Sequence, residues 1–109
     1  MIRVVVVALA ALAVTAGPAQ ARSCAPFRVS DGYITSLAVK RVGCATGGKV
    51  ARAHYACRHE NGKRGRCTHR VRRYRCTEGK RMSTSTEIDA KVTCTRGRRR
   101  VVFTYQQNL

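Results

Sequence analysis

The sequence has very little negative charge. Five Asp and Glu residues stand against 22 Lys and Arg residues in a chain of 109, which gives a formal net charge of +17. So large an excess predicts a negatively charged partner: an anionic polymer, a lipid head group, a nucleic acid or an acidic protein. If the protein is exported, envelope polymers and lipid head groups lie closer to it than nucleic acid, which is the less favoured ligand.

The sequence also lacks a long hydrophobic run. Its longest uncharged apolar stretch, Val4 to Val14, has 11 residues, well short of the ~20 that span a bilayer. Arg3 precedes this stretch, and the small residues Ala19-Gln20-Ala21 end it, as in a secretory signal peptide. We expect residues 1–21 to be removed after Ala21, leaving residues 22–109 as a single small secreted domain without a transmembrane segment. An uncleaved anchor is the alternative.

Apolar residues are scarce in residues 22–109, so a hydrophobic core needs support. All six cysteines lie in this part, and an even number in a short exported chain indicates a disulfide framework. A Cys57–Cys67 bridge would close a short polar loop, for which the chain-entropy model gives about 3 kcal/mol. For the others we predict Cys44–Cys76 and Cys24–Cys94, among several possible connectivities.

The pattern of apolar residues predicts one helix and a few strands. Residues 22–33 are expected to form an extended arm ending in a turn, and the helical period predicts a helix over about 45–57. Alternation predicts strands in 34–42, 71–76 and 87–94, the last forming a hairpin with the strand that follows. The expected fold class is α+β: one helix packed on a small antiparallel sheet of three to four strands, braced by disulfides. The expected core residues are Leu37, Val39, Val50, Ala53, Tyr74, Ile88, Val92, Val101 and Phe103.

Three segments of the chain resemble a known group of proteins. "VGCATGGKVARAH", "YRC" and "KVTCTRGRRRVVFTY" are similar to uncharacterised short secreted cysteine-containing α+β proteins of high-GC actinobacteria. The resemblance covers about residues 34–105. The chain departs from the group at Gly47-Gly48, where an arginine pair is more usual. The resemblance implies a fold and an exported location, and it supplies no catalytic residue because the group has no assigned activity.

Two Cys-x-His units, Cys57 with His59 and Cys67 with His69, raise the possibility of a metal. Two thiolates and two imidazoles can form a tetrahedral zinc site, and this Cys₂His₂ module is one alternative function. However, the spacing differs from the usual Cys-x₂₋₄-Cys and His-x₃₋₅-His patterns. Five Arg and Lys residues between Arg58 and Arg70 also disfavour a cation. We therefore favour the disulfide, with no metal and no cofactor.

A small secreted ribonuclease or phosphodiesterase is a second alternative. Such an enzyme needs a general base, a general acid and a cation, which His59, His69 and Lys63 would provide, with Glu60 as a partner. Nothing in their spacing is diagnostic. The sequence also has no serine nucleophile elbow, and "ATGGKV" lacks the first glycine and the Ser or Thr of a phosphate-binding loop. A non-enzymatic protein is therefore the favoured interpretation.

The density of basic residues carries most of the functional information. Two clusters, one from Arg58 to Arg75 and one from Arg96 to Arg100 on the predicted hairpin turn, would form one anion-binding surface if the fold brings them together. We expect the protein to be a monomer and expect Tyr74 to be available for stacking. The alternative is a solvated face that only maintains solubility. The predicted anion-binding residues are Arg58, Lys63, Arg64, Arg66, Arg70, Arg72, Arg73, Arg75, Arg96, Arg98, Arg99 and Arg100.

Overall fold

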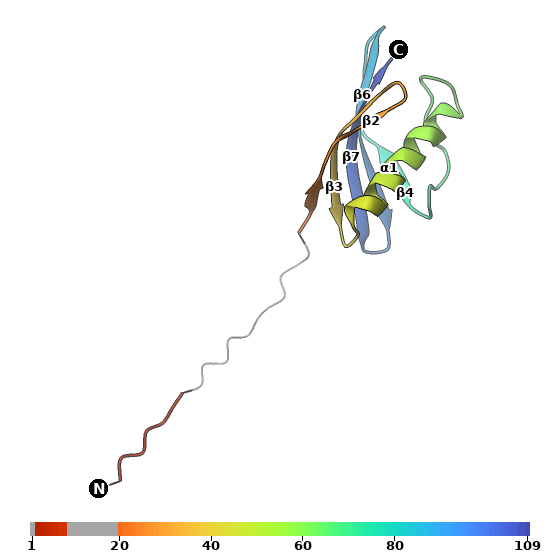
Figure 1. Cartoon of the computed structure of the whole chain (residues 1–109). Coiled ribbons are helices and arrows are strands. Elements are labelled where there is room, and N and C mark those ends of the chain that lie inside the picture. The colour runs from red at the N-terminus through yellow and green to blue at the C-terminus, as the bar shows by residue number, and fades with distance from the viewer. Residues whose placement is uncertain (1, 9–19) are drawn as a thin grey trace.

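The computed structural model describes residues 2–8 and 20–109 and shows one helix on one face of an antiparallel sheet (Figure 1). Helix α1 spans Cys44–His59. The strands are β1 (Arg22–Cys24), β2 (Phe27–Val29), β3 (Gly32–Lys40), β4 (Arg75–Glu78), β5 (Met82–Ser83), β6 (Glu87–Arg96) and β7 (Arg99–Asn108). The sheet order is β1-β3-β7-β6-β4, with β2 paired to β3 and β5 paired to β6. The predicted α+β class is confirmed.

The sheet has seven strands rather than the three to four predicted. The expected extended arm forms the short strands β1 and β2, which both pair with β3, and β5 is a two-residue strand on β6. Strands this short carry too few side chains to show a period of two. Their main chains are ordered by a neighbouring strand, which the local sequence does not reveal.

The β6–β7 hairpin confirms the predicted alternation. Ile88, Ala90, Val92 and Cys94 are all buried, whereas their odd-numbered neighbours are half-buried or exposed. The chain reverses at Gly97, whose φ of +58° lies in the left-handed region that glycine adopts at low cost. The hairpin places alternate side chains of two ten-residue strands under the helix.

Helix α1 packs closely on β3, and one glycine permits this. A Cβ atom at Gly47 would overlap the side chain of Val39, so only glycine allows the approach. Gly48 has no such neighbour; the nearest atom to a Cβ there would be Phe27 Cε1 at 3.9 Å. The helix begins one residue earlier and ends two residues later than the predicted 45–57. The sequence did not indicate this later end, because residues after Arg58 lack apolar periodicity.

The core lies between α1 and the sheet. Eight of the nine predicted core residues are buried, and the ninth, Ala53, is half-buried against the cluster. Tyr55 and Tyr105 also belong to this core, with their rings edge to face at 5.7 Å between centroids. The other face of the sheet, which we call the open face, has no helix over it (Figure 1).

Disulfides brace the domain at three places. The predicted Cys57–Cys67 bridge is present, but the other two predictions are wrong: the structure pairs Cys24 with Cys44 and Cys76 with Cys94. Three disulfides in one small chain are typical of an oxidising, extracellular environment.

Strand pairing explains both corrections. Pairing of β1 with β3 sets Cys24 opposite Leu37, and this brings the arm beside the first residue of α1, Cys44. Cys76 and Cys94 are directly opposed residues of β4 and β6, with their Cα atoms 4.0 Å apart. Strand register therefore pairs Cys76 with Cys94 directly, and it pairs Cys24 with Cys44 by placing the arm beside the start of α1.

The predicted signal peptide falls mostly outside the described residues, which omit residue 1 and residues 9–19. Residues 2–8 form neither helix nor strand, and the side chains of Ile2 and Val4 to Val7 are exposed. No helix in the described part of the chain has the length and apolar character needed to cross a membrane.

Candidate anion-binding surface

Basic residues from several segments gather at one end of the molecule, where α1 begins (Figure 1). The end of β3, the turn before β4 and the β6–β7 turn meet there. Strand register sets Lys40 opposite Arg100, Arg75 opposite Thr95 and Arg96 opposite Arg99. We call this set the basic end: Lys40, Arg41, Arg72, Arg73, Arg75, Arg96, Arg98, Arg99 and Arg100.

The acidic residues lie elsewhere. Asp31, Glu87 and Asp89 lie at the opposite end of the sheet, since they neighbour residues 106–108 of β7. Glu60 follows the last turn of α1. Glu78 is closest along the strands, but its side chain is only 6% exposed and already paired with arginines. The basic end therefore has no carboxylate to neutralise it.

Several basic side chains form a row across the open face. Directly opposed residues in neighbouring antiparallel strands share a face, so register aligns Lys40, Arg100, Thr95 and Arg75 over β3, β7, β6 and β4. Like charges placed directly opposite each other are destabilising. The Lys40–Arg100 pair thus weakens the fold and leaves an unneutralised positive row on the surface.

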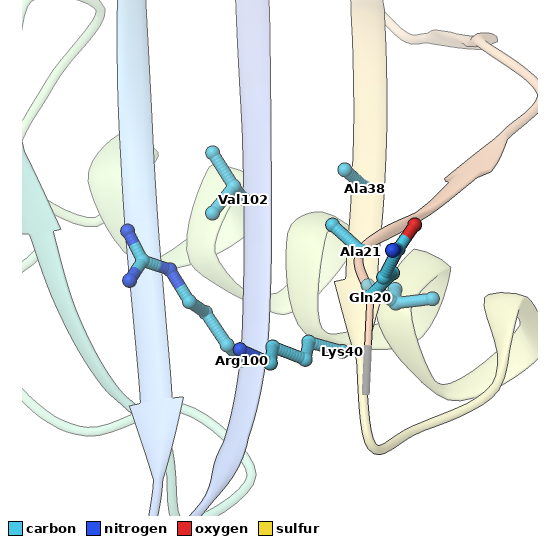
Figure 2. A pocket seen from close by; sticks show the side chains of 7 residues that line it. Gln20, Ala21, Ala38, Lys40, Arg100 and Val102 are labelled. Carbon is cyan, nitrogen blue, oxygen red and sulfur yellow. The ribbon is translucent and has the colours of Figure 1, made fainter. Parts of the chain in front are cut away.

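Figure 2 shows the row at its β3–β7 end. Lys40 and Arg100 border a pocket of about 500 Å³ with Ala38 and Val102 beside them on the open face, and Gln20 and Ala21 close one side. The side chains of Ala38 and Val102 next to the two cations are small. A negatively charged group can therefore approach Lys40 and Arg100 without displacing a bulky side chain.

Three arginines at the basic end have left-handed backbone conformations. Arg41, Arg72 and Arg73 have φ values of +58°, +48° and +68°, and they are the only such non-glycine residues in the described part of the chain. This conformation costs a residue with a Cβ roughly 1–2 kcal/mol. Arginine offers no local compensation of the kind that Asn or Asp provides. The strain is concentrated where the charge is concentrated, which points to a role for these side chains outside the fold.

The two sequence clusters meet only in part. Arg72, Arg73 and Arg75 join the hairpin-turn arginines, whereas the first part of the earlier cluster remains at the C-terminal end of α1. There Arg64 donates hydrogen bonds to Ser83 and to the Thr84 carbonyl. Arg66, Lys63 and Arg70 are exposed residues of the loop between α1 and β4.

Arg58 does not belong to the surface, which corrects its predicted role. Its side chain is fully buried, 4.1 Å from the Tyr105 ring centroid, and Nη2 donates to Gln107 Oε1 at 2.9 Å. Nε lies 3.9 Å from Glu78 Oε2. A buried charge without a partner would be very costly, and the Glu78 carboxylate supplies that partner.

Glu78 is the centre of a buried polar cluster. It accepts hydrogen bonds from Arg81 Nε at 2.6 Å and from the Tyr105 hydroxyl at 2.6 Å. Burial raises the pKa of Glu78, but the hydrogen bonds from Arg81 and Tyr105 outweigh it and hold the pKa below its usual value. Arg81 also donates to the carbonyls of Arg64 and Gly65, which ties the loop after α1 to the sheet.

The expected stacking role of Tyr74 is wrong. Tyr74 is 2% exposed because it packs in the core below the Arg72–Arg73 turn. Base stacking needs an accessible ring face. The basic end therefore presents arginine and lysine side chains, and Tyr74 provides no aromatic platform there.

The two histidines of the ribonuclease alternative are each held between two acceptors. His59 Nε2 lies 2.8 Å from Asp31 Oδ2, and Nδ1 lies 2.8 Å from the Tyr55 carbonyl oxygen. His69 contacts the Glu60 carboxylate at 3.0 Å and the Arg70 carbonyl at 2.8 Å. A base needs a ring nitrogen that can take a proton from the substrate, and these contacts occupy both nitrogens of each ring.

The titration of this region follows from these contacts. The hydrogen bond to the Arg70 carbonyl and the contact with Glu60 raise the pKa of His69. Burial raises the pKa of Asp31, but the hydrogen bonds from Tyr55 and His59 outweigh this effect. The pKa of Asp31 therefore lies below its ordinary value, and the carboxyl stays ionised. Each contact joins a histidine to a carboxylate from another part of the chain.

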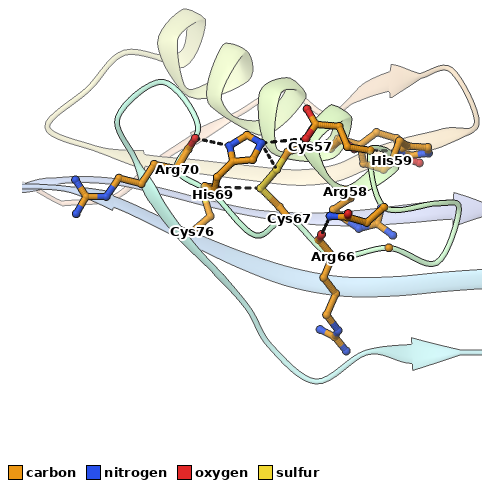
Figure 3. Close-up of a disulfide and its surroundings, with 12 residues drawn as sticks. Cys57, Arg58, His59, Arg66, Cys67, His69, Arg70 and Cys76 are labelled. Atoms are coloured by element: carbon orange, nitrogen blue, oxygen red, sulfur yellow. Dashed lines mark hydrogen bonds and ion pairs between the residues drawn. A yellow bond between two sulfur atoms is a disulfide. The ribbon is translucent and has the colours of Figure 1, made fainter.

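The sulfur atoms of the Cys₂His₂ alternative are bonded to each other. Figure 3 shows the Cys57–Cys67 disulfide with His69 beside it, its Nε2 3.3 Å from Cys57 Sγ. His59 points away to Asp31. A bridged pair offers no thiolate to a cation, so these residues do not form a metal site while the bridge is intact.

His54 is the remaining histidine and was not singled out from the sequence. It is 2% exposed and lies against the Cys76–Cys94 bridge and the edge of Phe103, and neither ring nitrogen has a hydrogen-bond partner. Burial lowers the pKa of His54 to about 4. The ring is therefore neutral near pH 7 and acts as a core residue.

Sequence reasoning missed two members of the basic end, Lys40 and Arg41. They lie near the end of the predicted strand over 34–42, and their positive charges at a strand end were a usable signal. Their proximity to the hairpin turn depends on β3 pairing with β7, which no local pattern indicates.

Comparison with known proteins yields no relative: no protein-family model matches the chain, and no curated protein or solved structure matches it.

Proposed function

We propose that this protein is a secreted, non-enzymatic basic protein that binds anionic cell-envelope material or an acidic partner through the basic end. The observation that carries the proposal is the separation of charge along the molecule. Nine basic residues from three segments meet where α1 begins, and all five carboxylates lie elsewhere. Such a field attracts a polyanion over several ångströms and weakens as salt screens it.

Two further observations support binding over simple solubility. A solvated face needs dispersed charge, but Lys40 and Arg100 are directly opposed, as are Arg96 and Arg99. Both pairs oppose folding. A negatively charged ligand would relieve both repulsions on binding.

Retention on an immobilised polyanion tests the proposal. The triple variant R98Q/R99Q/R100Q removes three charges from the basic end, and R28Q/K63Q/K80Q removes three exposed charges outside it. We expect the first variant to elute from a phosphocellulose column at clearly lower salt than the second. Equal elution of the two variants would mean that only net charge matters and would overturn the proposal.

The ribonuclease alternative is tested in the same preparation. We expect RNA to remain intact on incubation with the protein, and expect H59A/H69A to be retained on the column like the unmodified chain. RNA cleavage that disappears in H59A/H69A would establish the enzyme instead.

A further inference from the structure

We propose that a pocket within the basic end is a binding site for a phosphate group, formed by Thr46, Arg72, Arg73 and Arg96. This inference rests on the proposed function and identifies the chemistry of the anion. The pocket has a volume of about 270 Å³ and brings together the first turn of α1, the turn before β4 and the end of β6. It lies on the helix side of the sheet, because Thr46 belongs to α1 and Arg96 follows the even-numbered positions of β6 that face the helix.

The turn that carries two of the arginines is firmly anchored. Val71 and Tyr74 are 5% and 2% exposed, and their backbones exchange two hydrogen bonds, of 3.1 and 2.7 Å. This two-residue turn has left-handed conformations at both central positions, where Asn-Gly is the favoured pair. Arg72 and Arg73 are both exposed. The turn therefore presents two guanidinium groups from a fixed backbone.

The polar groups of the pocket are free to bind. In residues 20–109, no hydrogen bond or ion pair involves the side chains of Thr46, Arg72, Arg73 or Arg96, in contrast to Arg58 and Arg81, which are engaged inside the protein. Each guanidinium group has five N–H donors in a planar fork, and the threonine hydroxyl adds another donor. The pocket thus has many donors, a high positive charge and no acceptor from an acidic side chain.

This set of donors fits a phosphate better than a carboxylate. A carboxylate has two oxygens in one plane and a single charge, so one guanidinium fork already matches it. A phosphate spreads its oxygens over a tetrahedron and can accept from several forks at once. The three arginines come from two chain segments, so the pocket can offer a tetrahedral group donors from more than one fork.

The site is tested by observing the arginine side chains directly. In the oxidised ¹⁵N-labelled protein, NMR signals of the arginine Nε–H groups are followed during titration with inorganic phosphate and, separately, with acetate at the same ionic strength. We expect saturable shifts for Arg72, Arg73 and Arg96 with phosphate, at least fivefold weaker affinity for acetate, and little change at Arg28. Equal responses to both anions would overturn the phosphate site.

A charge-conserving variant separates this inference from the proposed function. R72K/R73K/R96K keeps the net charge but loses the planar forks. We expect it to lose the preference for phosphate over acetate by at least fivefold while eluting from a carboxylate column at unchanged salt. A variant that retains the preference would overturn the site, whereas unequal retention of R98Q/R99Q/R100Q and its control would still support the proposed function. Circular dichroism and the disulfide-intact mass check that the variant is folded.

The source of the phosphate is distinguished by two further probes. Polyphosphate represents a soluble anionic polymer, and vesicles containing phosphatidylglycerol represent a lipid surface. Signals of the pocket arginines that shift with polyphosphate at much lower concentration than with inorganic phosphate support a polymer ligand. A response to neither probe beyond that to inorganic phosphate would restrict the site to a free phosphate group.

Discussion

Lys40 and Arg100 lie directly opposite each other on β3 and β7, with both side chains on the open face of the sheet (Figure 2). Opposed like charges destabilise a strand pair, and in residues 20–109 no ion pair joins Lys40 or Arg100 to a carboxylate that would offset the repulsion. The arrangement weakens the fold at the place where the proposed function requires positive charge. The destabilisation caused by that charge can be measured by substituting one of the two residues.

Replacing Arg100 by Glu is expected to stabilise the protein and weaken polyanion binding. The new carboxylate would face Lys40, and an opposite-charge cross-strand pair contributes about 0.2–1 kcal/mol. Urea denaturation should show a higher midpoint for R100E, and a phosphocellulose column should release it at lower salt. The control K63E lies in an exposed loop, and its unfolding midpoint should change little. A lower midpoint for R100E would contradict the interpretation.

Relieving the strained turn is expected to separate stability from binding. The double variant R72N/R73G places the favoured pair in the left-handed positions. We expect its free energy of unfolding to be about 1–2 kcal/mol higher than that of the unmodified chain. Its affinity for inorganic phosphate should fall. R72Q/R73Q is the matched control because it removes the same charges but keeps the strain, so it should lose affinity without gaining stability. Thermal unfolding distinguishes the two.

The buried His54 is expected to make the protein less stable below neutral pH. Its folded pKa, about 4, lies below its ordinary value of 6.5, so the unfolded chain takes up the proton first. The contribution of His54 to the free energy of unfolding is fully present above pH 6.5. It falls as the pH drops towards 4 and does not change further below that pH. The shift corresponds to roughly 3 kcal/mol.

The variant H54L tests this assignment. Urea denaturation from pH 7 to pH 4 should show a much smaller loss of stability for H54L than for the unmodified chain. Asp31 and Glu78 have lowered pKa values and ordinary values of 3.8 and 4.5, so they lose their contributions mainly below about pH 5. The loss of stability between pH 7 and about pH 5 therefore reports on His54. If stability depended on pH in H54L as it does in the unmodified chain, this result would contradict the burial of a neutral ring.

Removing the Glu78 carboxylate is expected to destabilise the fold strongly. E78Q would leave the buried Arg58 without its counter-charge and weaken the bonds to Arg81 and Tyr105, and breaking a buried ion pair costs about 3–5 kcal/mol. E60Q, which alters only the exposed contact with His69, should cost less than about 1 kcal/mol. Similar unfolding free energies for the two variants would contradict the central role of Glu78.

The disulfides are expected to be needed for cooperative folding. Peptide mapping of the oxidised protein should recover three linked pairs, each joining neighbouring cysteines in the sequence: Cys24–Cys44, Cys57–Cys67 and Cys76–Cys94. Removing the 20-residue constraint with C24A/C44A should cost about 3 kcal/mol. Cooperative unfolding retained after complete reduction, or a recovered Cys44–Cys76 pair, would contradict the structure.

The sequence by itself determined the local features of this protein. The period of two in β6 and β7, the apolar period of α1 and the short polar loop closed by Cys57 and Cys67 each depend on residues close together in the chain. Composition likewise determined the excess of positive charge. These features follow from side-chain periodicity and loop closure, which act over a few residues.

Only the tertiary structure decided how distant segments meet. The pairing of Cys24 with Cys44, the burial of Arg58 and Tyr74, and the convergence of Lys40 with the hairpin turn all depend on the order and register of the strands. Register is a long-range property, because a shift of one residue moves every side chain of a strand to the other face. The two basic clusters of the sequence are therefore divided by the fold, and the part that joins Lys40 becomes the candidate binding surface.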